Sequence, residues 1–106
     1  MAKYLVQFSY TGEGVKGLLK EGGSKRRDAV DQLVRSMGGT LEAFYFTFGE
    51  HDGLCIVDAP DNVGTTAATL LVNASGGAET MTTVLVTPEE VDQAAKKTAD
   101  YRPPGQ

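Results

Sequence analysis

The stretch LEAFYFTFGEHDGLCIV, residues 41–57, decides the fold of this chain. Residues 41–48 and 54–59 are rich in aromatic and aliphatic side chains, which is typical of β-strands. The acidic segment 49–53 between them is bracketed by glycines and is short enough for a turn. We therefore predict an antiparallel hairpin with His51, the only histidine of the chain, at its tip.

Helix and strand signals on both sides of the hairpin predict the remaining elements. The expected elements are a strand over 3–10, a glycine-rich loop over 11–23, a helix over 24–37, the hairpin, a helix over 60–74, a strand over 79–86 and a helix over 88–99. The first two helices are each long enough for a right-handed crossover between parallel strands. This order predicts an α+β, ferredoxin-like βαββαβ fold, with four antiparallel strands, two helices on one face and a C-terminal helix.

Composition and charge exclude several classes of function. The 106 residues suffice for one domain, which we place at residues 1–100 with a flexible tail over 101–106. The formal net charge is −4 and the longest basic block is Lys25-Arg26-Arg27, so the cationic face that nucleic acid requires is missing. We expect no signal peptide, since the first residues lead directly into a predicted strand. The sequence has no apolar run of membrane-spanning length and one cysteine, Cys55, which we expect as a buried thiol. We expect a cytoplasmic protein with no nucleic-acid or membrane partner.

The predicted sheet is apolar on both faces. In the strand over 41–48, the alternation predicts Phe44, Phe46 and Phe48 on one face, and it predicts Leu41, Ala43 and Tyr45 on the other. Helices can cover only one face, and each large apolar side chain left in water forfeits about 1.5–3 kcal/mol. The simplest cover is a second copy of the chain, so we expect a homodimer or a larger oligomer in which two sheets pack face to face.

Several short motifs follow one another in an order and spacing typical of a known family. They are Lys3-Tyr4-Leu5-Val6 leading to Tyr10-Thr11, Lys25-Arg26, Gly38-Gly39-Thr40-Leu41-Glu42, Phe48-Gly49-Glu50-His51-Asp52, Asp58-Ala59-Pro60-Asp61 and Thr80-Met81-Thr82-Thr83. With these motifs the chain resembles the small bacterial GYD-domain proteins of the dimeric α/β barrel superfamily. The resemblance implies the fold and the dimer. It implies no single activity, because that superfamily includes cofactor-independent oxygenases, lactone isomerases, haem-degrading proteins and ligand-sensing modules.

The family signature Gly-x-Tyr-Asp is altered here, because His51 stands at the tyrosine position. A histidine beside a carboxylate suggests a proton-transfer pair, so His51 and Asp52 are the candidate catalytic residues, base and orienter. The alternative is structural: Asp52 bonds the backbone of its own turn while His51 lies at the hairpin edge. Because Glu50, His51 and Asp52 are consecutive, they cannot converge on one ion unaided, and we expect neither a metal nor another cofactor.

Aromatic and charged residues suggest a pocket for a small aromatic or apolar ligand. Buried tyrosine hydroxyls need partners, and an arginine at a helix start suits an anion. The candidate ligand-binding residues are Tyr4, Tyr10, Arg26, Tyr45 and Glu50. The motif Gly12-Glu13-Gly14-Val15-Lys16-Gly17 fits the dinucleotide fingerprint by spacing alone, and we interpret it as a mobile loop because Gly22-Gly23 interrupts the helix that the fingerprint requires.

Three functions remain open at this point. The first is a homodimeric small-molecule-binding module with an apolar cavity. The second is a cofactor-independent oxygenase or isomerase that uses His51 as general base. The third is a purely structural oligomerisation module. Whether the chain is an enzyme stays undecided by its residues.

Overall fold

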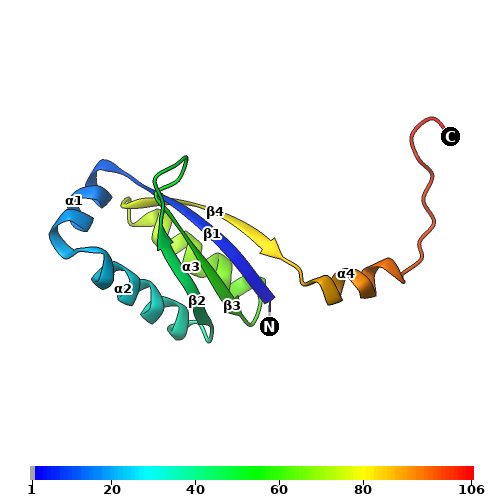
Figure 1. Cartoon of the computed structure of the whole chain (residues 1–106), viewed down its shortest axis with the longest axis horizontal. Helices are drawn as coiled ribbons and strands as arrows, with labels where there is room; N and C mark the ends of the chain where they lie inside the picture. Colours follow the sequence, from blue (N-terminus) through cyan, green and yellow to red (C-terminus); the bar gives the residue numbers. More distant parts are fainter. Residues whose placement is uncertain (1) are drawn as a thin grey trace.

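The computed structural model describes residues 2–106, and it has one four-stranded antiparallel sheet with helices on one face (Figure 1). The elements are β1 (Ala2–Tyr10), α1 (Gly12–Glu21), α2 (Gly23–Ser36), β2 (Thr40–Phe46), β3 (Gly53–Ala59), α3 (Asn62–Ala74), β4 (Ala78–Leu85) and α4 (Pro88–Ala95). The strand order is β2-β3-β1-β4. The α+β, ferredoxin-like prediction with a C-terminal helix is confirmed.

One element differs from the prediction, because residues 12–21 form helix α1 where we expected a loop. Thr11 caps this helix by accepting a hydrogen bond from the Gly14 N–H at 3.2 Å, and its own N–H and hydroxyl donate to the carbonyls of Gly77 and Gly76. A Cβ at Gly14 would lie 1.9 Å from the Gly77 carbonyl oxygen. The glycine that weakens the helix signal is thus what lets α1 approach the α3–β4 loop.

The structure corrects two expected side-chain positions. Phe48 lies beyond β2, which ends at Phe46, and is fully exposed. A bulge between Leu41 and Ala43 shifts the pairing of β2, so that Leu41 lies opposite Val57 while Phe44 lies opposite Cys55. Leu41 therefore shares the helix-covered face with Phe44 instead of the open face. The extra residue of a bulge breaks the strict alternation on which the prediction depended.

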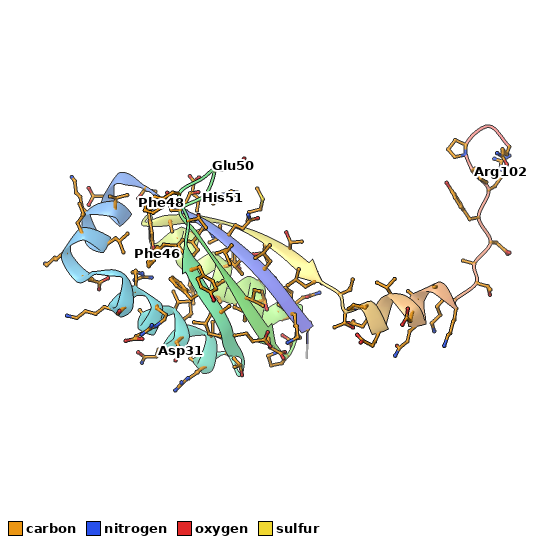
Figure 2. All side chains as sticks on the ribbon, in the orientation of Figure 1. Asp31, Phe46, Phe48, Glu50, His51 and Arg102 are labelled. Atoms are coloured by element: carbon orange, nitrogen blue, oxygen red, sulfur yellow. The ribbon has the colours of Figure 1, made fainter. Side chains whose placement is uncertain are left out.

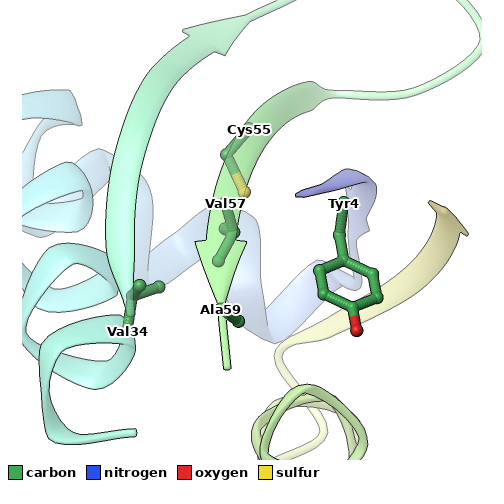
Figure 3. Close-up of a cluster of buried hydrophobic side chains, with 5 residues drawn as sticks. All are labelled: Tyr4, Val34, Cys55, Val57 and Ala59. Carbon is green, nitrogen blue, oxygen red and sulfur yellow. The ribbon is translucent and has the colours of Figure 1, made fainter. Parts of the chain in front are cut away.

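A small core lies between the sheet and α2 (Figure 3). Side chains of β1, β3 and α2 meet there, and these are Tyr4, Val34, Cys55, Val57 and Ala59, none more than 8 % exposed. Tyr4 reaches the start of α3, where its hydroxyl donates to the side-chain oxygen of Asn62. This bond satisfies the polar end of an otherwise apolar side chain.

Helix α4 stands apart from the rest of the molecule (Figure 1). It begins with a capping box between Thr87 and Glu90 but ends at Ala95, four residues before the expected end. Every residue from Pro88 to Gln106 is exposed. The radius of gyration is 17.0 Å, against about 13 Å for a compact chain of this length. We call residues 86–106 the C-terminal arm.

Within residues 2–106, none of the helices combines the length and the apolar character needed to cross a membrane.

Candidate ligand cavity

An apolar space lies between the sheet and the helix pair α2 and α3. One section, of about 80 Å³, runs from Val6 and Ala59 of the sheet to Met37 and Ala68 of the helices. A second section, of about 90 Å³, lies nearer the opposite end of β1. The two sections share lining side chains from both helices and the sheet, namely Val30, Leu33, Cys55 and Val72. They therefore form neighbouring parts of one apolar layer.

This layer opens into a larger cleft at the end of β1. The cleft has a volume of about 350 Å³ and lies between α1, α2, the end of α3 and the start of β4. Leu33 and Val72 line it as well as both apolar sections. Its size falls in the range of about 300–1,000 Å³ that is typical of small-molecule sites. We refer to this cleft and the two sections as the cavity.

Arg26 lies at the mouth of the cavity, in the first turn of α2. Its Nε is buried and has no hydrogen-bond partner among the described residues, 2–106. Its Nη1 is 4.0 Å from Oε2 of Glu21, the last residue of α1, which is the limit of an ion pair. The side chain of Arg26 is 34 % exposed. The Nε of this guanidinium group is therefore a donor that the described part of the protein leaves free.

Tyr10, the last residue of β1, lies beside Arg26 in the cavity wall. Burial raises the pKa of the Tyr10 hydroxyl above its ordinary value, and the nearby Arg26 guanidinium acts in the opposite direction. The hydroxyl therefore keeps its proton at neutral pH and is available as a donor. Of the predicted ligand residues, Tyr10 and Arg26 are the two that line the same cleft.

The other predicted ligand residues lie elsewhere. Tyr4 is only 2 % exposed, and its hydroxyl is engaged by Asn62. Tyr45 lies opposite Leu54 on the open face of the sheet and is 65 % exposed. Glu50 is at the exposed tip of the hairpin (Figure 2). The structure thus divides the five candidates among four separate places.

His51 and Asp52 have different partners. The His51 Nδ1 is 3.3 Å from the hydroxyl oxygen of Ser9, and His51 lies with Glu50 at the hairpin tip (Figure 2). The Asp52 carboxylate accepts a hydrogen bond from the Tyr10 N–H at 2.7 Å, and the Asp52 N–H donates to the Phe8 carbonyl at 2.9 Å. Asp52 thus fastens the hairpin to β1, and a catalytic role for the two residues stays a prediction.

Ligands for a metal ion do not gather in the described part of the chain: no group of three or more His, Cys, Asp or Glu side chains is placed to share one. Cys55 lies in the cavity wall, and burial raises the pKa of its thiol to about 11. The thiol is therefore protonated at neutral pH and contributes an apolar surface to the cavity.

Some cavity residues were not among the predicted site residues. Leu33 belongs to the apolar stripe of its helix, and such a stripe predicts contact with the sheet without telling a filled core from a hollow one. Val72 shares its side of α3 with Thr65 and Thr69, so no apolar periodicity singles it out. Glu21 fell within the expected loop, so its place beside Arg26 was not predicted.

Compared with known protein families, the chain matches the model of the GYD domain over residues 4–95. None of the curated proteins or solved structures searched matched this chain.

Proposed function

The chain belongs to the GYD domain family, and from this premise we propose that it is a homodimeric module that binds a small apolar molecule in the cavity. The observation that carries the proposal is the cavity itself, an apolar space between sheet and helices with Arg26 and Tyr10 at its mouth. A mostly apolar cavity with a few polar groups at one end is the usual design of a small-molecule site. The reduced, buried Cys55 supports a cytoplasmic location.

The dimer is supported by the open face of the sheet. The strand register places apolar side chains of four strands side by side there, namely Leu5, Ala43, Tyr45, Leu54, Ile56 and Met81. Tyr45 and Met81 are 65 % and 56 % exposed. Because each large apolar side chain removed from water contributes about 1.5–3 kcal/mol, pairing two such faces strongly favours association.

The C-terminal arm gives a second argument for an assembly. Helix α4 has eight residues and no buried side chain. Isolated helices shorter than about 12–15 residues are marginal in water, so α4 gains stability by packing on another surface. In a dimer built on the open face, the arm that follows β4 has a second copy of the chain within reach.

Cavity binding is tested by a thermal-shift screen with aromatic acids, lactones, quinones and haem, because a ligand that binds the native state raises the melting temperature. The matched variants are Val72→Phe, which fills the cavity, and Val63→Phe on the exposed surface of the same helix. We expect a ligand that shifts the wild type to shift Val63→Phe equally and to lose its effect on Val72→Phe. Equal shifts for both variants would place binding outside the cavity.

The dimer is tested by sedimentation equilibrium. Ile56→Lys puts a charge in the centre of the open face, whereas Leu19→Lys puts the same charge on α1, where Leu19 is 82 % exposed. We expect the wild type and Leu19→Lys to be dimers and Ile56→Lys to be a folded monomer. A wild type that is monomeric at all concentrations would contradict the dimer while leaving cavity binding open.

A further inference from the structure

The buried part of Arg26 indicates what kind of molecule the cavity takes. Its Nε is shielded from water and unpaired within the described chain, although a buried donor without a partner is unfavourable. The ion pair of this guanidinium group joins its Nη1, not its Nε, to Oε2 of Glu21 at 4.0 Å, and the Glu21 side chain is half-exposed. The protein therefore holds the Nε donor of a cation at the cavity mouth without an acceptor among the described residues.

We propose, resting on the function proposed above, that the cavity binds a monocarboxylate with an apolar body, and that Arg26 and Tyr10 hold the carboxylate. The planar guanidinium group presents paired donors that match the two oxygens of a carboxylate. The Tyr10 hydroxyl, in the same wall, adds a third donor. The apolar body extends past Leu33 and Val72 into the space between sheet and helices.

Charge balance at the mouth favours a single negative charge over two. Arg26 and Glu21 are the charged residues of the cleft wall, so the wall is neutral overall. A bound carboxylate replaces Glu21 as the partner of Arg26. The Glu21 side chain is exposed enough to rotate away toward the solvent. A dianion such as a phosphate monoester would leave one charge without a counterpart in a partly desolvated site.

The test compares octanoate with 1-octanol, which has the same chain length and no charge, by NMR titration of the isotope-labelled full chain. We expect octanoate to bind the wild type about tenfold more tightly, the size of effect that one charge-assisted pair gives. Arg26→Gln is expected to abolish this preference. Lys25→Gln, the neighbouring exposed cation, is the matched control and is expected to keep it.

The possible outcomes separate this inference from the proposed function. If the wild type binds octanoate and octanol equally, the cavity binds apolar molecules but the carboxylate assignment is wrong. If neither binds, both the cavity function and the assignment fail. If Arg26→Gln keeps the preference, the carboxylate is held elsewhere. Should Arg26→Gln fold poorly, Tyr10→Phe, which removes only the hydroxyl, is expected to weaken octanoate binding more than octanol binding.

Discussion

The carboxylate of Asp52 accepts a hydrogen bond from the backbone N–H of Tyr10 at 2.7 Å, which joins the tip of the β2–β3 hairpin to the end of β1. Tyr10 also lines the cavity. The acidic residue of the turn motif therefore has a positioning role, because it fixes the backbone from which a cavity side chain projects. His51, its neighbour, contacts Ser9 instead.

This bond predicts a stability loss for Asp52→Ala. The substitution leaves the Tyr10 N–H without its acceptor, and we expect the free energy of unfolding to fall by about 1–2 kcal/mol. Asp52→Asn keeps an acceptor oxygen and should lose less. Urea denaturation followed by circular dichroism measures both. His51→Ala, which removes a side chain with one long contact, is the matched control, and an equal loss for His51→Ala would contradict the assignment.

Two glycines of α1 are predicted to respond to alanine in opposite directions. At Gly14 the new Cβ would meet the Gly77 carbonyl oxygen at 1.9 Å, so we expect Gly14→Ala to lower stability by about 1–3 kcal/mol. At Gly17 nothing in the described structure lies within 4 Å of the new Cβ, and alanine should stabilise the helix by about 0.5–1 kcal/mol. Urea denaturation of both variants shows whether each substitution raises or lowers the free energy of unfolding. A loss at both positions would mean that α1 needs glycine for its backbone rather than for space.

Helix α1 also shows where the sequence prediction failed and why. Glycine has the lowest helix propensity after proline, so a segment with Gly12, Gly14 and Gly17 is predicted to be a loop. Tertiary contact overrides this tendency, because Thr11 caps the helix and ties it to the α3–β4 loop. The strand order and the hairpin were predictable, since they depend on periodic apolar residues and a short turn. The bulge that redirects Leu41 leaves no such periodic signal.

The candidate site was predictable in its residue types more than in its arrangement. Tyr10 and Arg26 follow from general chemistry, a tyrosine on an apolar strand and a cation at a helix start. That the two residues line the same cleft depends on where the end of β1 lies relative to α2, which is a long-range property of the fold. Tyr4 satisfies the same criterion as Tyr10, but Asn62 engages its hydroxyl, and no local pattern distinguishes the two.

The buried thiol of Cys55 predicts a loss of stability at alkaline pH. Its pKa is about 11 in the folded chain, against an ordinary value of 9.0. Below pH 9 both states hold the proton, and between pH 9 and 11 the unfolded chain loses it first, so folding weakens by about 2–3 kcal/mol over this range. Denaturation at several pH values measures the slope. Cys55→Ala is the reference: its stability should fall less over the same range, and parallel curves would contradict the assignment.

Gly53 predicts a specific coupling to Phe8 across the β1–β3 pair. The two residues lie opposite each other, and a Cβ at Gly53 would lie 2.1 Å from the Cζ atom of Phe8. Because the Phe8 ring is buried and has little room to move, we expect Gly53→Ala to cost about 1–3 kcal/mol. In a Phe8→Leu background the clash is removed, and the same substitution should cost at least about 1 kcal/mol less.

The control for this cycle is Gly49→Ala in the same hairpin, where the described structure has nothing within 4 Å of the new Cβ. Its cost should be small and equal in both backgrounds, since residues without shared contacts add independently. Urea denaturation of the variants gives the coupling free energy. An unchanged cost of Gly53→Ala in the Phe8→Leu background would show that β3 needs this glycine for its backbone, and not because the Phe8 ring occupies the place of a Cβ.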